Sequence, residues 1–246
     1  MLAALDLAKG FGFTEVETAG TGALTTGQFA DELRRRGLRA VSAHLSYEAL
    51  RIDPAGAIRD AQTLGAKFIV CPFLPHAPHG FKDDDASRVA ADFNRFGEAC
   101  CDSGLRFGYH PHGFEFTPSA AGNGDTVFDV LARETKPECV DFELDAFWVV
   151  HAGQDPVALL EKYPTRWALM HVKDLRRGAP AGFSTGQAAP EDNVAVGTGQ
   201  IAWPVVLRAA RKAGVRHYFL EDETPEPLRC IPISLAYLCG LTGTLG

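Results

Sequence analysis

The stretch Trp167-Ala-Leu-Met-His171-Val-Lys173-Asp174 runs from apolar residues directly into a histidine, a lysine and an aspartate. A short apolar run without alternation is typical of a strand that is buried on both faces of a parallel sheet. The polar residues at its end have the types that bind metals and move protons. The stretch therefore predicts a buried strand whose carboxyl end carries chemistry.

Three further stretches end in the same way. They are Arg106-Phe-Gly-Tyr-His110-Pro-His112, Val140-Asp-Phe-Glu-Leu-Asp145 and His217-Tyr-Phe-Leu-Glu221-Asp222-Glu223. In a barrel of parallel strands the carboxyl ends all open onto one face, where the catalytic residues lie. Four successive strands with such endings indicate one shared site at one end of a barrel.

Predicted strands and helices alternate along the whole chain, which favours a parallel α/β sheet. The length of 246 residues suits one (β/α)8 TIM barrel, which typically needs about 250 residues. We therefore expect a single TIM-barrel domain over residues 1–246. The predicted strands cover residues 14–17, 39–44, 67–72, 106–110, 140–145, 167–172 and 217–221, and the predicted helices cover 2–9, 27–36, 54–64, 84–102, 126–134, 156–163, 203–213 and 233–238.

The chain opens directly in a helix, so the pattern contains seven strands and eight helices. A barrel of this class begins with a strand, and the expected fold is therefore a TIM barrel that lacks its first β-strand. Such a gap would leave two unpaired strand edges. Homodimers are common among these barrels, and a homodimer would cover the surface that the missing strand leaves.

The amino-acid composition and the net charge disfavour several classes of function. A formal net charge of −7 disfavours a nucleic-acid backbone as the main partner, because such binders need a basic face. No apolar run reaches the ~18 residues of a membrane span, and the N-terminus lacks a signal-peptide pattern. The six cysteines form no CxxC pair and are interpreted as small core residues in a reducing compartment. We expect a cytoplasmic protein whose partner is neither nucleic acid nor membrane.

The strand endings predict a metal site. Asp145, His171 and Glu221 each end a predicted strand, and mixed imidazole and carboxylate ligands suit Mn, Co, Zn, Fe or Mg as one divalent ion. Two residues compete for the fourth position. His110 holds the strand end, while Glu115 follows five residues later in His110-Pro-His112-Gly-Phe-Glu115.

The chain resembles the sugar phosphate isomerase/epimerase family, which has the xylose-isomerase-like TIM barrel. The matching phrases run nearly end to end in the order and spacing of that family. They are Gly12-Phe-Thr-Glu-Val-Glu17, Gly37-Leu-Arg-Ala-Val-Ser-Ala-His44, Leu64-Gly-Ala-Lys-Phe-Ile-Val, Tyr109-His-Pro-His-Gly-Phe-Glu-Phe116, Leu144-Asp-Ala-Phe-Trp148, Ala152-Gly-Gln-Asp-Pro156, His171-Val-Lys-Asp174, Val196-Gly-Thr-Gly-Gln-Ile201 and Glu221-Asp-Glu223.

This resemblance implies a divalent metal held by Glu, Asp, His and Glu from four successive strands. It assigns the last three ligands to Asp145, His171 and Glu221. The first departs from the pattern, since His110 stands where the family often has Glu. A subgroup with a Tyr-His-x-His-x-x-Glu phrase is more similar, which assigns Glu115 as the fourth ligand and leaves His110 as the alternative.

The chemistry that the resemblance implies is isomerisation or epimerisation of a sugar or sugar phosphate. A proton is removed beside a carbonyl, and the metal polarises the carbonyl and stabilises the enediolate. Glu221, His110 and His112 are the candidate acid–base groups, with Glu115 a further candidate, and Lys173 binds a substrate oxygen or developing negative charge. The family also contains inosose dehydratases with a Tyr-His-Pro-His phrase, so a lyase of inosose or keto-glycoside type is the main alternative.

Other readings have less support. An abasic-site DNA endonuclease would need several zinc ions and a basic groove, and a truncated barrel would be a metal-free binding protein. Four residues are expected to contact a carbohydrate substrate: His44, His76, Phe114 and Trp148. Residues 178–199 are expected to form a long loop, in which Gly197-Thr-Gly199 makes a backbone anion cup.

Overall fold

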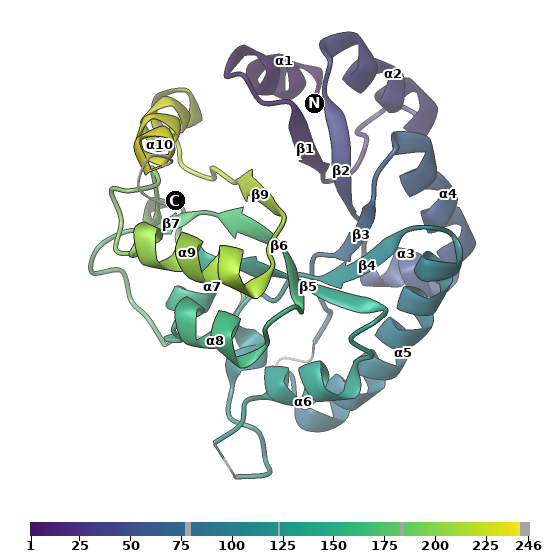
Figure 1. The fold of residues 1–246 in the computed structure, drawn as a ribbon, viewed down its shortest axis with the longest axis vertical. Coiled ribbons are helices and arrows are strands. Elements are labelled where there is room, and N and C mark those ends of the chain that lie inside the picture. Colours follow the sequence, from purple (N-terminus) through teal and green to yellow (C-terminus); the bar gives the residue numbers. More distant parts are fainter. Residues whose placement is uncertain (77–79, 123, 183–184, 242–246) are drawn as a thin grey trace. The chain divides into compact units, whose positions relative to one another are not determined.

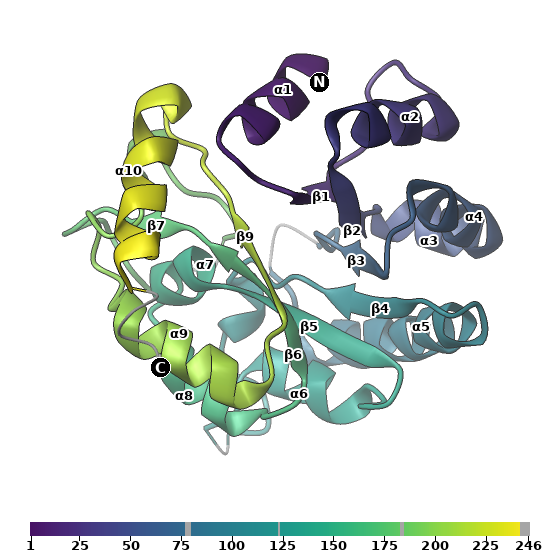
Figure 2. The same ribbon diagram turned by 45° about the horizontal axis from the view of Figure 1, so that its top comes forward.

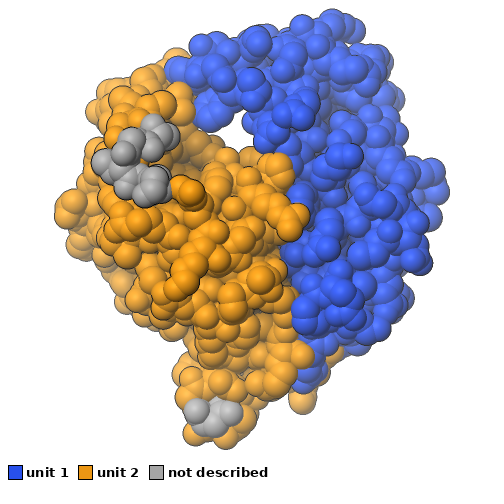
Figure 3. Space-filling view, in the orientation of Figure 1, with its two compact units in different colours: residues 1–75, 88–109, 134–141 blue, residues 76–87, 110–133, 142–246 orange. Residues whose placement is uncertain are grey.

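The computed structural model describes residues 1–76, 80–122, 124–182 and 185–241. Backbone contacts divide the chain into two compact units, coloured separately in Figure 3. Unit 1 comprises residues 1–75, 88–109 and 134–141, and unit 2 comprises residues 76–87, 110–133 and 142–246. The two units are described in turn, and the expected single domain stays a prediction.

Unit 1 contains four parallel strands in the order β1-β2-β3-β4. Helices follow these strands along the chain, and α2 packs beside α4 (Figure 1). The strands are β1 (Glu15–Thr18), β2 (Arg39–His44), β3 (Phe68–Cys71) and β4 (Arg106–Tyr109), and the helices are α1 (Leu2–Gly10), α2 (Thr26–Arg36), α3 (Tyr47–Ile52), α4 (Pro54–Leu64) and α5 (Asp83–Asp102), of which α5 begins in unit 2.

Local signals in the sequence set the ends of α2. The Thr25 hydroxyl accepts the Gln28 N–H while the Gln28 side chain accepts the Thr25 N–H, which forms a capping box. Gly37 ends the helix in the left-handed conformation that glycine adopts without a steric penalty. Between these ends, Phe29 and Leu33 are buried in an apolar cluster of this unit.

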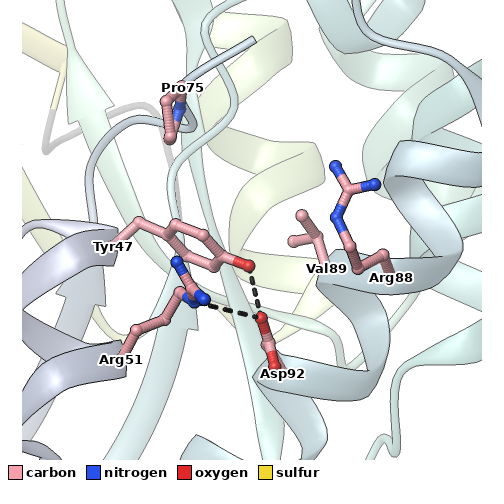
Figure 4. A pocket seen from close by; sticks show the side chains of 6 residues that line it. All are labelled: Tyr47, Arg51, Pro75, Arg88, Val89 and Asp92. Carbon is pink, nitrogen blue, oxygen red and sulfur yellow. Dashed lines mark hydrogen bonds and ion pairs between the residues drawn. The ribbon is translucent and has the colours of Figure 1, made fainter.

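A small pocket of unit 1 lies between α3 and α5 (Figure 4). In this pocket the Tyr47 hydroxyl of α3 donates to the Asp92 carboxylate of α5, and the Arg51 guanidinium lies 3.9 Å from the same carboxylate. Burial and this hydrogen bond raise the pKa of Tyr47 above its usual range. These polar contacts join two helices, and the pocket is lined by none of the residues that the sequence singled out.

Unit 2 contains three parallel strands in the order β5-β6-β9. The helix α8 packs beside α9, as Figure 2 shows. The strands are β5 (Val140–Asp145), whose first two residues belong to unit 1, β6 (Trp167–Val172) and β9 (His217–Leu220); the helices are η1 (Phe114–Phe116), α6 (Val127–Glu134), α7 (Ala146–His151), α8 (Pro156–Lys162), η2 (Pro190–Asp192), α9 (Trp203–Ala213) and α10 (Pro227–Leu241).

The aromatic core of unit 2 fixes β5 and β6, the two strands that carry most of the polar endings. Phe128 of α6 stacks on Trp167 at 5.6 Å, and Phe142 of β5 lies 5.4 Å from the same indole. These rings are nearly inaccessible to solvent. Burying such large side chains contributes about 1.5–3 kcal/mol each. This packing fixes the positions of β5 and β6 and of the residues at their ends.

The predicted strands correspond to the seven parallel strands, and the expectation that the chain opens in a helix is confirmed by α1. Several boundaries and elements were predicted wrongly. The helices α3 and α7 were missed because each has only six residues. The helix predicted over 233–238 begins at Pro227 and runs through Pro232, a residue that usually interrupts a helix.

The prediction of a long loop over residues 178–199 was also wrong in part. The strand β7 (Asp174–Leu175) pairs with the antiparallel strand β8 (Asn193–Val194), and the turn η2 precedes β8. The buried side chain of Asp192 accepts two bonds from the Arg176 guanidinium, the shorter at 2.6 Å. Among the described residues, no helix is long and apolar enough to cross a membrane.

Candidate active site

Asp145 is the last residue of β5 and also caps the helix that follows. Its Oδ1 atom accepts the backbone N–H of Trp148 at 3.1 Å, which starts α7 directly after the strand. Its Oδ2 atom is buried and has no hydrogen-bond partner among the residues that the structure describes. The cap therefore holds one carboxylate oxygen and leaves the other directed into the site.

His171 brings a second side chain to the same point. It lies on β6 directly opposite Asp145 in the strand register. Its Nδ1 atom is 3.6 Å from Asp145 Oδ2 and 3.3 Å from Oε2 of Glu221, which directly follows β9. Asp145, His171 and Glu221 together offer three ligand atoms within 4.8 Å of one another.

His110 follows β4 and reaches the same carboxylate oxygen. Its Nε2 atom lies 3.6 Å from Asp145 Oδ2, and its ring packs edge-on against His171 with centroids 4.5 Å apart. Both imidazoles are buried. The second nitrogen of each ring lies 3.5 Å from Glu143, a carboxylate with no solvent exposure.

The arrangement around Asp145 fits a divalent metal ion. Hydrogen bonds from ring nitrogens to a carboxylate are about 2.7–3.2 Å long, so contacts of 3.6 Å leave Asp145 Oδ2 unsatisfied. Two ligands that each bind a tetrahedral ion at about 2.1 Å are separated by about 3.4 Å. The distances of His110 and His171 from Asp145 Oδ2, both 3.6 Å, and of His171 from Glu221, 3.3 Å, agree with that separation.

Glu115 lies in a different setting from the one expected of a ligand. It is fully buried in η1, and both of its carboxylate oxygens accept the His112 N–H, at 3.1 and 3.2 Å. Its oxygens are not in the group of ligand atoms around Asp145. The group of three ligand atoms around Asp145 includes neither Glu115 nor His110, although His110 Nε2 lies 3.6 Å from Asp145 Oδ2. The choice of Glu115 as fourth ligand, with His110 as the alternative, stays a prediction.

His112 contributes a neutral imidazole beside this group. Its ring stacks on His110 with centroids 4.5 Å apart and lies 5.2 Å from Trp148. Burial, reinforced by the neighbouring His110, lowers the pKa of His112 to about 3. The imidazole is therefore uncharged near neutral pH.

Lys173 is the buried cation of the site. Its Nζ atom lies 3.1 Å from Glu221 Oε2 and 2.5 Å from Glu223 Oε2, and it faces the ring of Trp148 at 5.4 Å. Burial acts to lower the pKa of Lys173, but the carboxylates of Asp145, Glu221 and Glu223 outweigh it and raise that pKa. The ammonium group stays charged next to Glu221.

Asp145 and Glu221, two of the acidic groups at the site, both have lowered pKa values. Burial acts to raise the pKa of Glu221, yet His171 and Lys173 bring it down to about 2. The pKa of Asp145 is lowered in the same way against its burial, first by His110 and His171 and then by Lys173. Both carboxylates are thus in the form that binds a cation or accepts a proton.

The predicted substrate-binding residues fall into two groups. In unit 2, Trp148 lies beside His112, and His76 stacks on Phe114 with centroids 4.1 Å apart. In unit 1, His44 lies at the end of β2, where its Nε2 atom is 2.7 Å from Glu17 Oε1. The stack of His76 on Phe114 is a contact within the protein, and the role of all four residues toward substrate stays a prediction.

The expected anion cup binds a carboxylate of the protein itself. The Gly197 and Gly199 N–H groups donate to Asp174 Oδ2 at 2.8 and 3.2 Å, and the Trp203 indole donates to the same oxygen at 3.0 Å. The Ile201 N–H donates to Oδ1 at 3.2 Å. The prediction that this segment binds an anion through its backbone N–H groups was correct, but the anion is the Asp174 carboxylate. These hydrogen bonds therefore stabilise the fold, and we call them the Asp174 clamp.

Sequence reasoning missed Glu143 and Glu223 as members of the site. The signal for Glu143 was present, because Asp141, Glu143 and Asp145 alternate along β5 and therefore share one face. A signal for Glu223 was present as well, in the polar stretch Glu221-Asp222-Glu223 after the predicted strand, but no role was assigned to it. It lies beyond the end of β9, and only the path of the chain brings its carboxylate to Lys173.

Parallel strands with polar residues at their carboxyl ends are typical of TIM-barrel enzymes. The model of the xylose isomerase-like TIM barrel family matches residues 5–238, and the chain belongs to this family. The expected fold class, a xylose-isomerase-like TIM barrel, is thereby confirmed, and the described residues contribute seven parallel strands where such a barrel usually has eight.

Several known proteins are similar to the chain. Inosose dehydratase from Lacticaseibacillus casei is 24% identical over 197 residues, which cover 70% of this chain and 62% of the relative. Inosose dehydratase from Clostridium beijerinckii is 27% identical over 125 residues, 46% of this chain and 40% of the relative. The matched part thus spans less than two thirds of the length of either relative.

Solved structures show the same fold. A sugar phosphate isomerase/epimerase from Parabacteroides distasonis has a TM-score of 0.76 and 26% identity, and the match covers 97% of this chain and 87% of that one. The IOLI protein, solved with a bound zinc atom, has a TM-score of 0.75 at 14% identity, and the match covers 99% of this chain and 93% of that chain. The second similarity concerns the fold alone.

Proposed function

We propose that the protein is a divalent-metal-dependent isomerase or epimerase that acts on a sugar or a related polyhydroxy ketone. The observation that carries this proposal is the buried Asp145 Oδ2 atom, which faces two imidazoles at 3.6 Å and accepts no hydrogen bond from the described residues. A buried carboxylate oxygen is normally hydrogen-bonded or bound to a metal.

Asp145, His171, Glu221 and His110 are the residues that would hold the ion. A bound divalent ion supplies Lewis-acid polarisation of a substrate carbonyl, which acidifies the neighbouring C–H bond. The donor set does not select among Mn, Co, Zn, Fe and Mg, because imidazole and carboxylate ligands suit several of them.

The protein's own groups supply the proton transfer. Glu221 and His112 are the candidate groups to take the proton from carbon, because both are in their unprotonated form near neutral pH. Glu115 remains a further candidate base. The charged Lys173 ammonium donates hydrogen bonds and favours negative charge developing on a substrate oxygen. Trp148 offers an aromatic face beside His112 for a carbohydrate ring.

A lyase is the second candidate function. The two relatives compared above by sequence are named inosose dehydratase, and dehydration begins with the same removal of a proton beside a carbonyl. The two reactions differ in whether a hydroxyl group then leaves the neighbouring carbon. The support for the isomerase comes from the structural relative in Parabacteroides distasonis.

Metal content tests the site. Protein purified without chelator is expected to contain about one divalent ion per chain by elemental mass spectrometry, and Asp145→Ala and His171→Ala should lose it. Circular dichroism should show that both variants remain folded. Retention of the metal by both folded variants would show that the site is assigned wrongly.

Product analysis separates the two reactions. Ketoses and inososes are incubated with the metal-loaded enzyme in deuterated water and followed by NMR and mass spectrometry. Deuterium incorporation with no loss of water supports the isomerase, whereas a product lighter by one water supports the lyase. Failure of every substrate to exchange a proton would contradict both reactions.

A further inference from the structure

The pocket between α3 and α5 in unit 1 has the size and the lining of a site for a small ligand. Its volume is about 240 Å³, somewhat below the range of about 300–1,000 Å³ that is usual for drug-sized ligands. Apolar walls with a few polar groups are the usual composition of a ligand site. The lining residues, labelled in Figure 4, are Tyr47, Arg51, Pro75, Arg88, Val89 and Asp92.

Tyr47 is the most firmly held of the polar lining residues. Only 8% of its surface is exposed, and its ring packs edge-on against Phe93 and Phe96 of α5, with centroids 6.3 Å apart in both pairs. Its hydroxyl donates a hydrogen bond to Asp92. The ring and the hydroxyl are therefore fixed in position by contacts within the protein.

Asp92 is the one carboxylate among the described residues that line the pocket, and both of its oxygens have partners. Oδ2 accepts the hydrogen bond from Tyr47, and Oδ1 accepts one from the Arg95 guanidinium at 2.7 Å. Arg95 does not line the pocket, so it compensates the charge of Asp92 from outside. The Asp92 carboxylate therefore needs no further cation inside the pocket.

Arg51 of α3 and Arg88 of α5 bring two positive charges to the lining. Burial and the hydrogen bond to Asp92 raise the pKa of Tyr47, whereas the charges of Arg51 and Arg88 act to lower it, so both guanidinium groups act on the Tyr47 hydroxyl. The Arg51 guanidinium lies 3.9 Å from Asp92 and 3.4 Å from the exposed Glu48. Both distances exceed the 2.7–2.9 Å of a strong charge-assisted hydrogen bond. Because a guanidinium has five N–H donors, Arg51 retains donors for a ligand.

We propose that this pocket binds a small phosphate monoester whose phosphate group lies between the guanidinium groups of Arg51 and Arg88. The planar fork of N–H donors on a guanidinium matches the oxygens of a phosphate group. Two positive charges and one negative charge line the pocket, which favours an anion even though the whole chain has a net charge of −7. Tyr47, Pro75 and Val89 offer apolar surface to the organic part of the ester.

Inorganic phosphate is a competing ligand, because it would use the two arginines and leave the apolar residues without contacts. Two probes distinguish these ligands. Phenyl phosphate carries the phosphate group on an apolar ring, and inorganic phosphate has no organic part. We expect phenyl phosphate to bind more tightly by about 10-fold or more, because its ring buries apolar surface. Equal affinity for the two probes would overturn the assignment of a monoester.

The first measurement is a calorimetric titration of the metal-free wild-type protein with phenyl phosphate, repeated on the folded Asp145→Ala variant. We expect binding with equal affinity in both proteins, because none of the candidate metal ligands lines the pocket. Absence of binding to the wild type would overturn the proposal. Loss of binding in the Asp145→Ala variant would show that the phosphate group binds at the candidate metal site, and this result would also overturn it.

The variants Arg51→Gln and Arg88→Gln test the two guanidinium groups. Each should weaken the binding of phenyl phosphate by about 10-fold or more, because a charge-assisted hydrogen bond is lost. The matched control Arg59→Gln removes the same charge from α4, where Arg59 lies 3.6 Å from Asp53 and does not line the pocket. It should keep the affinity within about 2-fold, because salt screens exposed charges. An equal effect of all three substitutions would contradict the site.

The variant Asp92→Asn tests the sign of the charge on the ligand. Asparagine can still accept the hydrogen bond from Tyr47, while one negative charge is removed from the lining, so the affinity for phenyl phosphate should stay equal or rise. Weaker binding to the variant, shown by circular dichroism to be folded, would overturn the proposal. A protein with isomerase or lyase activity that does not bind phenyl phosphate would refute this site and leave the proposed function intact.

Discussion

The indole N–H of Trp203 donates to the Asp174 carboxylate at 3.0 Å across 29 residues of chain. Three backbone N–H groups, those of Gly197, Gly199 and Ile201, donate to the same carboxylate. A side chain at Gly199 would place its Cβ atom 2.2 Å from Asp174 Oδ1, so only glycine fits there. The hydrogen bonds that Asp174 accepts therefore hold the segment that precedes α9 close to Lys173.

Replacing this carboxylate should destabilise the protein. The variant Asp174→Asn keeps the shape but presents an amide donor to the surrounding donors, and each buried donor left unsatisfied costs about 1–3 kcal/mol. We expect the free energy of unfolding in urea to fall by about 3 kcal/mol. The control Asp155→Asn changes the exposed cap of α8, where asparagine caps equally well. If the two variants were equally stable, the claim that the hydrogen bonds to Asp174 stabilise the protein would be contradicted.

The fourth metal ligand can be decided between His110 and Glu115. His110→Ala removes a nitrogen 3.6 Å from Asp145 Oδ2 and should weaken zinc binding at least about 10-fold. Glu115→Gln should leave zinc affinity within about 3-fold, because its carboxylate binds the His112 N–H instead. Loss of zinc from a folded Glu115→Gln protein would reverse this assignment.

Lys173 should matter for turnover and not for metal retention. Lys173→Met removes a cation 3.1 Å from Glu221, so electrostatic repulsion of a bound ion decreases and metal affinity should stay equal or increase. Turnover should fall by about 100-fold or more, because a donor to the developing negative charge is lost. Steady-state kinetics and a zinc titration on the same preparation measure both. Full turnover in the variant would exclude this role.

His112 should contribute to acid sensitivity. Its pKa in the folded protein is about 3, below the value of about 6.5 expected in the unfolded chain. Between pH 6.5 and 3 the unfolded state therefore binds more protons at this residue, and the stability contribution of neutral His112 is lost as the pH falls.

The variant His112→Asn isolates this effect. Its free energy of unfolding should depend on pH less steeply than that of the wild type over this range, by at most about 1.4 kcal/mol per pH unit. Asp145 and Glu221 interact electrostatically with His112, so the comparison reports the titration of the imidazole together with its coupling to these two carboxylates. Identical slopes in urea denaturation series would show that His112 titrates normally in the folded protein.

The sequence by itself determined the order of strands and helices and most of the residues at the strand ends. Apolar runs that stop at His171, Asp145 and Glu221 were sufficient, because parallel strands deliver their carboxyl ends to one face. Helix boundaries such as Thr25 and Gly37 followed from capping chemistry that involves only neighbouring residues.

Only the tertiary structure decided which of these side chains meet and in what state. Glu143 became part of the site through its contacts with two rings from other segments, and Asp174 filled the cup that had been expected to bind a foreign anion. The separation of two residues along the chain does not show whether folding brings them into contact. It also does not show the burial that keeps His112 neutral. Hydrogen-bond partners and pKa values depend on which groups folding removes from water and on the charges it places beside them.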